Sequence, residues 1–188
     1  MTSLLEVPAV RQQVHRMSID EYHRVIEAGA IPENVELLRG IVVTKMAKSP
    51  LHEFVAQVLM QLLLALVPKG FVVRPERPLT LGDSEPEPDI SVVQGKPADW
   101  IKGHPRTAHL VVEVAISSEA IDLHKADIYA EAGIQEYWLV RPEERVIDVY
   151  RGPTREGYLS KTTVNDSEKL QSESLPTVVF DVREVFPS

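Results

Sequence analysis

An apolar run interrupted by one carboxylate, HLVVEVAISSEAIDLHK at residues 109–125, constrains the fold of this chain most strongly. Nearly every position from 110 to 116 is apolar and valine is frequent, which predicts a strand that is buried on both faces. Glu113 lies in the middle of that strand. A buried, ionised carboxylate costs several kcal/mol unless a cation, hydrogen bonds or protonation compensates it. The sequence therefore predicts a partner opposite Glu113, either an ordinary arginine or water at a strand end, or the other groups of a functional site.

Length and composition indicate one folded unit. The chain has 188 residues, of which 44% are hydrophobic and 26% are charged, enough for one sizeable core but not for two ordinary domains. We expect a single domain over residues 1–188, with residues 1–16 as an irregular N-terminal arm because they show no clear apolar period. The absence of cysteine excludes disulfides, thiolate metal sites and cysteine nucleophiles.

Charge and hydropathy limit the location and the partners. The N-terminus lacks the basic segment and longer apolar core of a secretory signal, and no apolar run approaches a membrane span. We therefore expect a cytoplasmic protein without a membrane partner. The formal net charge of -8 opposes broad, nonspecific coating of nucleic acid, but it does not exclude a local basic groove.

The apolar pattern and the turn residues predict alternating helices and strands. In the first half of the chain, we expect a helix capped by Ser18 and ending at Gly29, a hairpin turning at Arg39-Gly40, a long helix at 50–67 and two short extended pieces within 71–82. A strand at 90–94, a loop at 95–107 and the strand with Glu113 should follow. The rest should form a helix from Asp122 to Gly133, strands at 135–140 and 145–151, and a polar, turn-rich tail. This order predicts an α/β (α+β) domain, with a mixed central sheet flanked by helices.

Three of these elements carry residues that together suggest phosphodiester hydrolysis. Asp89 follows a proline at the start of one strand, Glu113 lies within the next, and Lys125 is expected in the first turn of the following helix. Two carboxylates on neighbouring strands repel each other, and a bound Mg²⁺ or Mn²⁺ would offset that repulsion. A lysine beside the metal can hold the attacking water and offset charge that builds on phosphorus.

This arrangement resembles the PD-(D/E)XK nuclease superfamily, and more closely a family of restriction-endonuclease-like domains. The matching segments are ELLRG at 36–40, PDISVV at 88–93, VVEV at 111–114, DLHK at 122–125 and GIQEYWLV at 133–140. The resemblance implies a restriction-endonuclease-like fold and a Mg²⁺- or Mn²⁺-dependent endonuclease, with nucleic acid, DNA above all, as its substrate. It further implies that Asp89, Glu113 and Glu36 hold the metal and that Lys125 acts with them in catalysis. The superfamily's usual lysine stands two residues after the acid, where this chain has Ala115, so Lys125 would replace it from the helix.

Each candidate also has a plainer interpretation. Asp89 could cap a turn after proline, Lys125 could pair locally with Asp122 or Asp127, and Glu36 could be an exposed strand residue. The histidines His52, His109 and His124 fit surface or hydrogen-bonded core positions, although His52 at a helix start could touch a phosphate. Gln135, on the strand after the helix, could orient a water molecule.

A second function remains open beside the nuclease. The acidic net charge and Ala115 also fit a catalytically silent, nuclease-like binding or regulatory module, which would form a homodimer through the apolar helix at 51–67. Other enzyme classes have little support, because GxSxG, GxGxxG and GxxxxGK motifs are all absent from the sequence.

Overall fold

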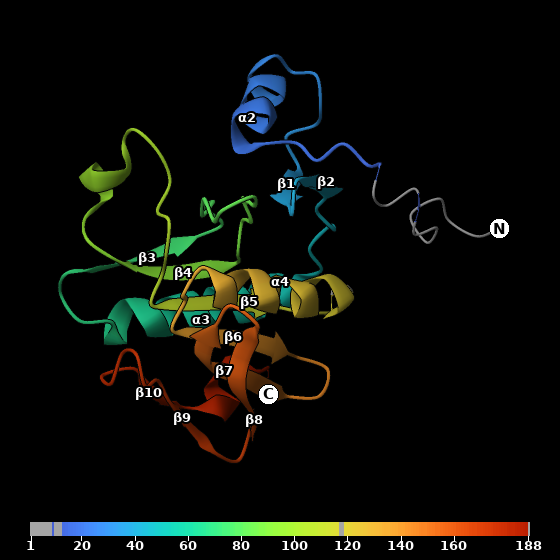
Figure 1. The fold of residues 1–188 in the computed structure, drawn as a ribbon. Helices are drawn as coiled ribbons and strands as arrows, with labels where there is room; N and C mark the ends of the chain where they lie inside the picture. The colour runs from blue at the N-terminus through green and yellow to red at the C-terminus, as the bar shows by residue number, and fades with distance from the viewer. Residues whose placement is uncertain (1–8, 10–12, 117–118, 188) are drawn as a thin grey trace.

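A mixed sheet of six strands forms the body of the protein (Figure 1). The computed structural model describes residue 9, residues 13–116 and residues 119–187, so the expected arm at 1–16 lies mostly outside the described residues. The strand order is β3-β4-β5-β6-β7-β8; the bounds are Phe71–Pro75, Ile90–Gln94, Leu110–Val114, Glu136–Arg141, Val146–Thr154 and Gly157–Asn165. Strands β5 and β6 run parallel and the other neighbours antiparallel. The predicted mixed sheet is confirmed.

Two helices cover opposite faces of this sheet (Figure 1). Helix α3 (Pro50–Leu66) packs on one face, and α4 (Glu119–Glu131), the crossover between the parallel strands β5 and β6, packs on the other. Alternate side chains of β5 divide between the two cores: Leu110, Val112 and Val114 lie with the α3 residues, and Val111 lies with those of α4. Since strand side chains alternate, Glu113 faces α4. The prediction of a strand buried on both faces is therefore confirmed.

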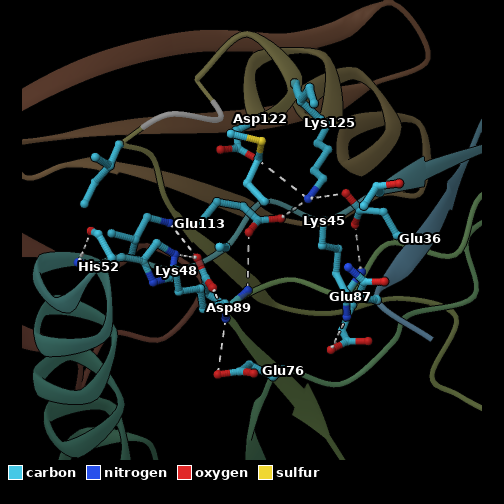
Figure 2. Close-up of a pocket in the computed structure, with 18 residues that line it drawn as sticks. Glu36, Lys45, Lys48, His52, Glu76, Glu87, Asp89, Glu113, Asp122 and Lys125 are labelled. Carbon is cyan, nitrogen blue, oxygen red and sulfur yellow. Dashed lines mark hydrogen bonds and ion pairs between the residues drawn. The ribbon is translucent and has the colours of Figure 1, made fainter. Parts of the chain in front are cut away.

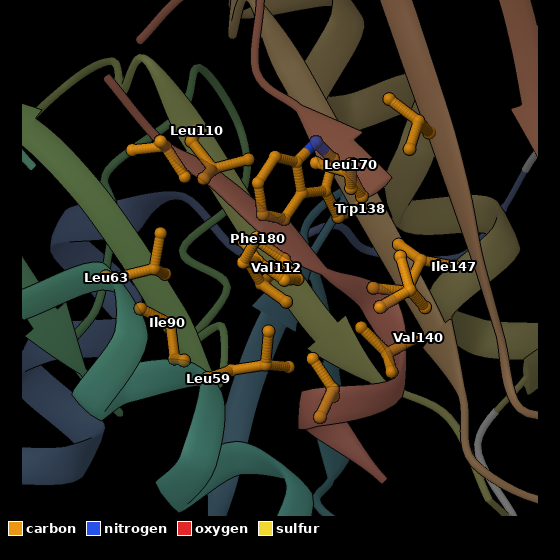
Figure 3. Close-up of a cluster of buried hydrophobic side chains, with 14 of the residues drawn as sticks. Leu59, Leu63, Ile90, Leu110, Val112, Trp138, Val140, Ile147, Leu170 and Phe180 are labelled. Carbon is orange, nitrogen blue, oxygen red and sulfur yellow. The ribbon is translucent and has the colours of Figure 1, made fainter. Parts of the chain in front are cut away.

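The core on the α3 side is the larger one and is shown in Figure 3. Leu59 and Leu63 of α3 meet Val112 of β5 and Trp138 of β6 there. The C-terminal segment closes this core with β9 (Lys169–Gln171), β10 (Val179–Asp181) and the 3₁₀ helix η3 (Val182–Val185). Phe180 packs against Trp138, with the ring centroids 6.0 Å apart, so the tail completes the core that supports β5.

A separate hairpin lies beside the sheet and carries Glu36 (Figure 1). Strands β1 (Val35–Leu38) and β2 (Ile41–Thr44) form their own two-stranded sheet. Both turn residues, Arg39 (φ 53°) and Gly40 (φ 73°), are left-handed, as a two-residue hairpin turn of this twist requires. Helix α2 (Ile19–Glu27) precedes the hairpin and begins with a capping box between Ser18 and Glu21. The predicted hairpin and the predicted N-cap of the first helix are confirmed.

Gly40 allows the hairpin turn to pack against the chain that leads into α2, which gives a first prediction. A Cβ at this position would lie 2.7 Å from the Arg16 Cβ and 3.0 Å from the Met17 carbonyl oxygen. We expect Gly40→Ala to lower the free energy of unfolding by about 2 kcal/mol or more. Gly29 is the matched control: it also has a left-handed φ of 62° but has no atom near a built Cβ, so Gly29→Ala should cost only about 1 kcal/mol. Equal losses in chemical denaturation would contradict the close-packing explanation.

The structure corrects three predicted elements. Helix α4 begins at Glu119 rather than after Asp122, so Asp122 lies inside the helix and Lys125 falls in its second turn. The segment after Gly152 was expected to be a polar, turn-rich tail, but residues 157–165 form β8, whose mostly exposed, polar residues lack the alternation that marks a half-buried strand. The expected turns follow at residues 166–168 and 173–177. The second extended piece within 71–82 is reduced to one isolated bridge between Leu81 and Ser84. The expected loop at 95–107 contains the short 3₁₀ helix η2 (Pro97–Trp100).

In the described part of the chain, every helix is too short or too polar to cross a lipid bilayer.

Candidate active site

The two candidate metal ligands on neighbouring strands lie side by side. Antiparallel pairing places Ile90 opposite Val112, so Asp89, just before β4, comes next to Glu113. The Asp89 backbone N–H donates to Glu113 Oε2 at 3.3 Å, and the Val114 N–H donates to Asp89 Oδ2 at 2.8 Å. Strand register therefore brings the two carboxyl groups together where β4 begins and β5 ends. There they line a pocket of about 410 Å³ (Figure 2).

Helix α4 supplies the groups that face Glu113. Lys125 and Tyr129 are four residues apart, so both lie on the same face of the helix. The Lys125 Nζ lies 3.1 Å from Glu113 Oε1, and the Tyr129 hydroxyl donates to the same oxygen at 2.7 Å. Lys125 also lies 3.6 Å from Asp122 Oδ1, one turn earlier. The partner that the sequence required opposite Glu113 is therefore Lys125 together with Tyr129.

Glu36 joins the cluster from the hairpin. Its Oε1 lies 3.0 Å from the Lys125 Nζ, and its Oε2 accepts the Glu87 backbone N–H at 3.2 Å. Lys125 thus connects three carboxylates from β1, β5 and α4, as the dashed lines in Figure 2 show. All four residues that the sequence singled out, Glu36, Asp89, Glu113 and Lys125, line one pocket and are buried.

Two further residues contact Asp89, one from the first turn of α3 and one from the segment just before it. The Lys48 Nζ lies 2.8 Å from Asp89 Oδ1, and His52 Nε2 lies 3.0 Å from Asp89 Oδ2. Because an ionised carboxylate only accepts hydrogen bonds, His52 Nε2 carries the proton in this contact. His52 was a minor candidate from the sequence, whereas Lys48 and Tyr129 were not predicted. The spacing of Lys125 and Tyr129 was a usable signal for Tyr129, whereas the contact of Lys48 with Asp89 joins residues 41 apart and left no local pattern.

The other residues considered from sequence lie outside this cluster. His109 packs edge-on against Phe71, with the ring centroids 4.9 Å apart, and His124 is exposed on α4. The Gln135 amide donates to the Gly133 carbonyl oxygen at 3.0 Å and is exposed. These three positions fit the plainer interpretations.

The two adjacent carboxyl groups differ in their proton affinity. Burial raises the pKa of Glu113 to about 8; Lys125 opposes the shift, and the charges of Asp122, Asp89 and Glu36 add to it. Burial would also raise the pKa of Asp89, but His52 and Lys48 outweigh it, so that pKa lies below its usual value. Asp89 is therefore ionised at neutral pH, whereas Glu113 holds a proton more readily.

The lysine of the cluster is held in its charged form. Burial alone would lower the pKa of Lys125, but Glu113, Glu36 and Asp122 raise it above the usual value. An ammonium group with a raised pKa is a poor proton acceptor at neutral pH. Lys125 is thus suited to donate hydrogen bonds and offset negative charge, rather than to act as a base.

The lining of the pocket combines acidic and basic side chains. Six carboxyl groups face three lysines there, namely Glu36, Glu76, Glu87, Asp89, Glu113 and Asp122 against Lys45, Lys48 and Lys125. Within the described residues, no group of three or more acidic or histidine side chains is arranged to hold a metal. Asp89 and Glu113 would therefore supply two ligands, and water the others, which is the usual coordination of Mg²⁺ in proteins.

Comparison with known proteins agrees with this fold. A similar solved structure is that of a putative nuclease belonging to DUF820 from Anabaena variabilis ATCC 29413, with a TM-score of 0.75 and 18% identity over 90% of this chain and 97% of that one. The type IIG restriction endonuclease BpuSI shares 18% identity over 65% of this chain and 14% of its own, but its TM-score of 0.37 is too low to support an argument. No curated protein matches the chain significantly in sequence.

The fold is thus that of a restriction-endonuclease-like α+β domain. Residues 19–183 match the model of the Uma2 family, described as "Putative restriction endonuclease", and the chain belongs to that family. The resemblance inferred from the sequence motifs is confirmed.

Proposed function

We propose that this protein is a divalent-metal-dependent nuclease that hydrolyses phosphodiester bonds, with DNA as its substrate. The observation that carries the proposal is the contact of Asp89 with Glu113 across neighbouring strands, with the Lys125 ammonium 3.1 Å from Glu113. The family description and the nuclease-like fold support the same reaction class, and restriction-endonuclease-like nucleases generally use divalent metals.

Each residue of the cluster has a distinct role in this proposal. Asp89 and Glu113 would hold Mg²⁺ or Mn²⁺, and Glu36 would complete the acidic set or orient a water molecule beside the metal. The metal, when bound, lowers the pKa of a water molecule and offsets charge on the phosphate. Lys125 donates hydrogen bonds toward the attacking water and the phosphate oxygens. Tyr129 fixes the Glu113 carboxyl group by donating to Oε1.

A cleavage assay tests the proposal directly. Purified protein is incubated with single-stranded DNA, duplex DNA or RNA, in the presence of Mg²⁺, Mn²⁺ or a chelator. We expect metal-dependent cleavage that falls by about 100-fold or more in Asp89→Asn, because the metal loses its ionised ligand. Thermal unfolding of the variant checks that the fold persists. Cleavage that survives both the chelator and Asp89→Asn would overturn the proposal.

One observation favours the second candidate, a nuclease-like module that binds without cutting. Every carboxylate oxygen of Asp89 and Glu113 already has a protein partner: Lys48, His52 and the Val114 N–H for Asp89, and Lys125, Tyr129 and the Asp89 N–H for Glu113. Failure of both metal binding and cleavage in the wild-type protein would favour this module. The homodimer predicted through α3 is tested separately, by sedimentation at several protein concentrations.

A further inference from the structure

Lys48 lies at the boundary between the buried acidic cluster and the solvent. Its Nζ contacts Asp89 Oδ1 at 2.8 Å and Glu76 Oε1 at 3.2 Å (Figure 2). The Lys48 side chain is 32% exposed, whereas that of Asp89 is 8% exposed. A long, flexible ammonium side chain therefore neutralises the ionised carboxylate from the open side of the pocket, which is also the side from which a ligand must arrive.

We propose that Lys48 neutralises Asp89 while no metal is bound. A divalent cation that bound Asp89 would displace the Lys48 ammonium group, and Lys48 would then contact an oxygen of the substrate phosphate. This inference rests on the proposed function, because it takes Asp89 as a metal ligand. The ammonium group and a divalent cation carry like charges and compete for the same carboxylate. Their competition lowers the metal affinity of the free protein.

Glu76 makes the displacement feasible. Its side chain is 61% exposed, and its backbone N–H donates to the Asp89 carbonyl oxygen at 3.0 Å, so its place beside Asp89 is fixed. Glu76 has a left-handed φ of 46°, an uncommon conformation for a residue other than glycine, and one that is frequent at functional sites. When Lys48 leaves Asp89, Glu76 still offers it an anion and keeps the ammonium group within the pocket.

The consequence is a coupling between two ligands. Metal binding would free the Lys48 ammonium group, which already lies where it can contact a phosphate oxygen. The metal would therefore raise the affinity for phosphate by more than the direct contact between metal and phosphate provides. Lysine is well suited to this role, because it binds phosphate as a point charge. By thermodynamic reciprocity, phosphate raises the affinity for the metal by the same factor.

Lys45 provides a matched control within the same pocket. It lines the pocket and is 30% exposed, close to the value for Lys48, but its Nζ pairs with Glu87 Oε1 at 3.0 Å. Lys45→Met and Lys48→Met remove the same charge from the same pocket. Long-range electrostatics therefore affect both variants, and the contact with Asp89 distinguishes them.

The first measurement is a calorimetric titration of Mg²⁺ into wild type, Lys48→Met and Lys45→Met. We expect the Mg²⁺ affinity to rise about tenfold or more in Lys48→Met, because the competing cation is gone, and less than about threefold in Lys45→Met. The second measurement titrates inorganic phosphate at saturating Mg²⁺. Phosphate is the group that DNA and RNA share, so the result does not depend on which of them is the substrate. There Lys48→Met should bind phosphate about tenfold more weakly than Lys45→Met.

The outcomes separate this inference from the proposed function. If wild type binds Mg²⁺ and Lys48→Met binds it no more tightly than Lys45→Met, the displacement is wrong and the nuclease proposal stands. Equal phosphate affinities of the two variants likewise overturn the phosphate contact of Lys48. If neither wild type nor Lys48→Met binds Mg²⁺, the proposed function fails and this inference fails with it.

Discussion

Glu113→Gln is expected to abolish cleavage while making the metal-free protein more stable. The change removes a proposed metal ligand, so activity should fall by about 100-fold or more. It also removes a group that is costly to ionise in the folded state, because burial raises the pKa of Glu113 to about 8 from an ordinary value of 4.5. Loss of function together with a gain in stability is typical of a residue retained for chemistry rather than for folding.

The pH dependence of this gain follows from the pKa shift. Between pH 4.5 and about 8, the folded wild type binds the Glu113 proton and the unfolded chain does not, so its stability falls as the pH rises. Glutamine does not titrate. The variant should therefore match wild type near pH 4.5 and exceed it increasingly up to pH 8, by at most about 5 kcal/mol at about 1.4 kcal/mol per pKa unit. Denaturant unfolding at several pH values, without metal, measures the difference.

Glu136 is the matched control for Glu113. It lies buried on the adjacent strand β6, with its Oε1 2.7 Å from Arg151 Nε and Ser172 donating to its Oε2. Glu136→Gln should destabilise the protein, because that carboxylate is paired with a cation. Added Mg²⁺ should stabilise wild type and Glu136→Gln but not Glu113→Gln. A Glu113→Gln protein that is less stable than wild type throughout pH 5–8, or that still responds to Mg²⁺, would contradict the assignment.

Lys125→Met should produce the largest loss of stability at the site. The side chain is 6% exposed and its ammonium group contacts Glu36, Glu113 and Asp122. Removing one partner of a buried ion pair leaves uncompensated charge and costs about 3–5 kcal/mol. Cleavage should also fall by about 100-fold, since a cation that stabilises the transition state is lost. Chemical denaturation and single-turnover cleavage measure the two effects.

Two companion variants test the structural role of Lys125. Lys161 on β8 is 45% exposed and pairs with buried Asp148 at 2.8 Å, and Asp148 also contacts Arg141 Nε at 3.2 Å. Lys161→Met leaves Asp148 with this second cation, so it should cost only about 1 kcal/mol and retain activity. The double variant Glu113→Gln/Lys125→Met should regain about 2 kcal/mol or more relative to Lys125→Met, because one uncompensated carboxyl group is removed. It should be inactive in any case, because it also lacks Glu113, so only its stability is informative. A double variant no more stable than Lys125→Met would contradict the explanation by uncompensated charge.

The sequence predicted the parts of the fold that local patterns determine. The β5 strand, the β1–β2 hairpin and the cap of α2 each follow from residues close together in the chain, and the structure confirms them. The start of α4 was misplaced because aspartate is a common N-cap, whereas Asp122 is buried beside Lys125. Strand β8 was missed because it lies at the sheet edge, where an exposed strand needs little apolar pattern.

The candidate site divides in the same way. Motif spacing identified Asp89, Glu113 and Lys125, and the family resemblance added Glu36; the structure brings all four to one pocket. The contact of Lys48 and His52 with Asp89 depends on how α3 packs against the sheet, which no local pattern encodes. Asp89 and Glu113 are 24 residues apart in the sequence, and they come into contact only because β4 and β5 pair in this antiparallel register.

The pocket lies at a boundary between two sheets, because the hairpin that carries Glu36 is separate from the six-stranded sheet. Strands β1 and β2 are hydrogen-bonded to each other in a sheet of their own. Contacts that join the hairpin to the rest include the bridge between Leu37 and Glu85, the contact of Glu36 with Lys125 and the pair of Arg39 with Glu131 of α4. Lifting the hairpin would withdraw Glu36 while Asp89 and Glu113 stayed together on the six-stranded sheet. Local opening of this kind requires less free energy than global unfolding. A compound that bound between the hairpin and the six-stranded sheet would therefore remove Glu36 from the pocket without unfolding the protein.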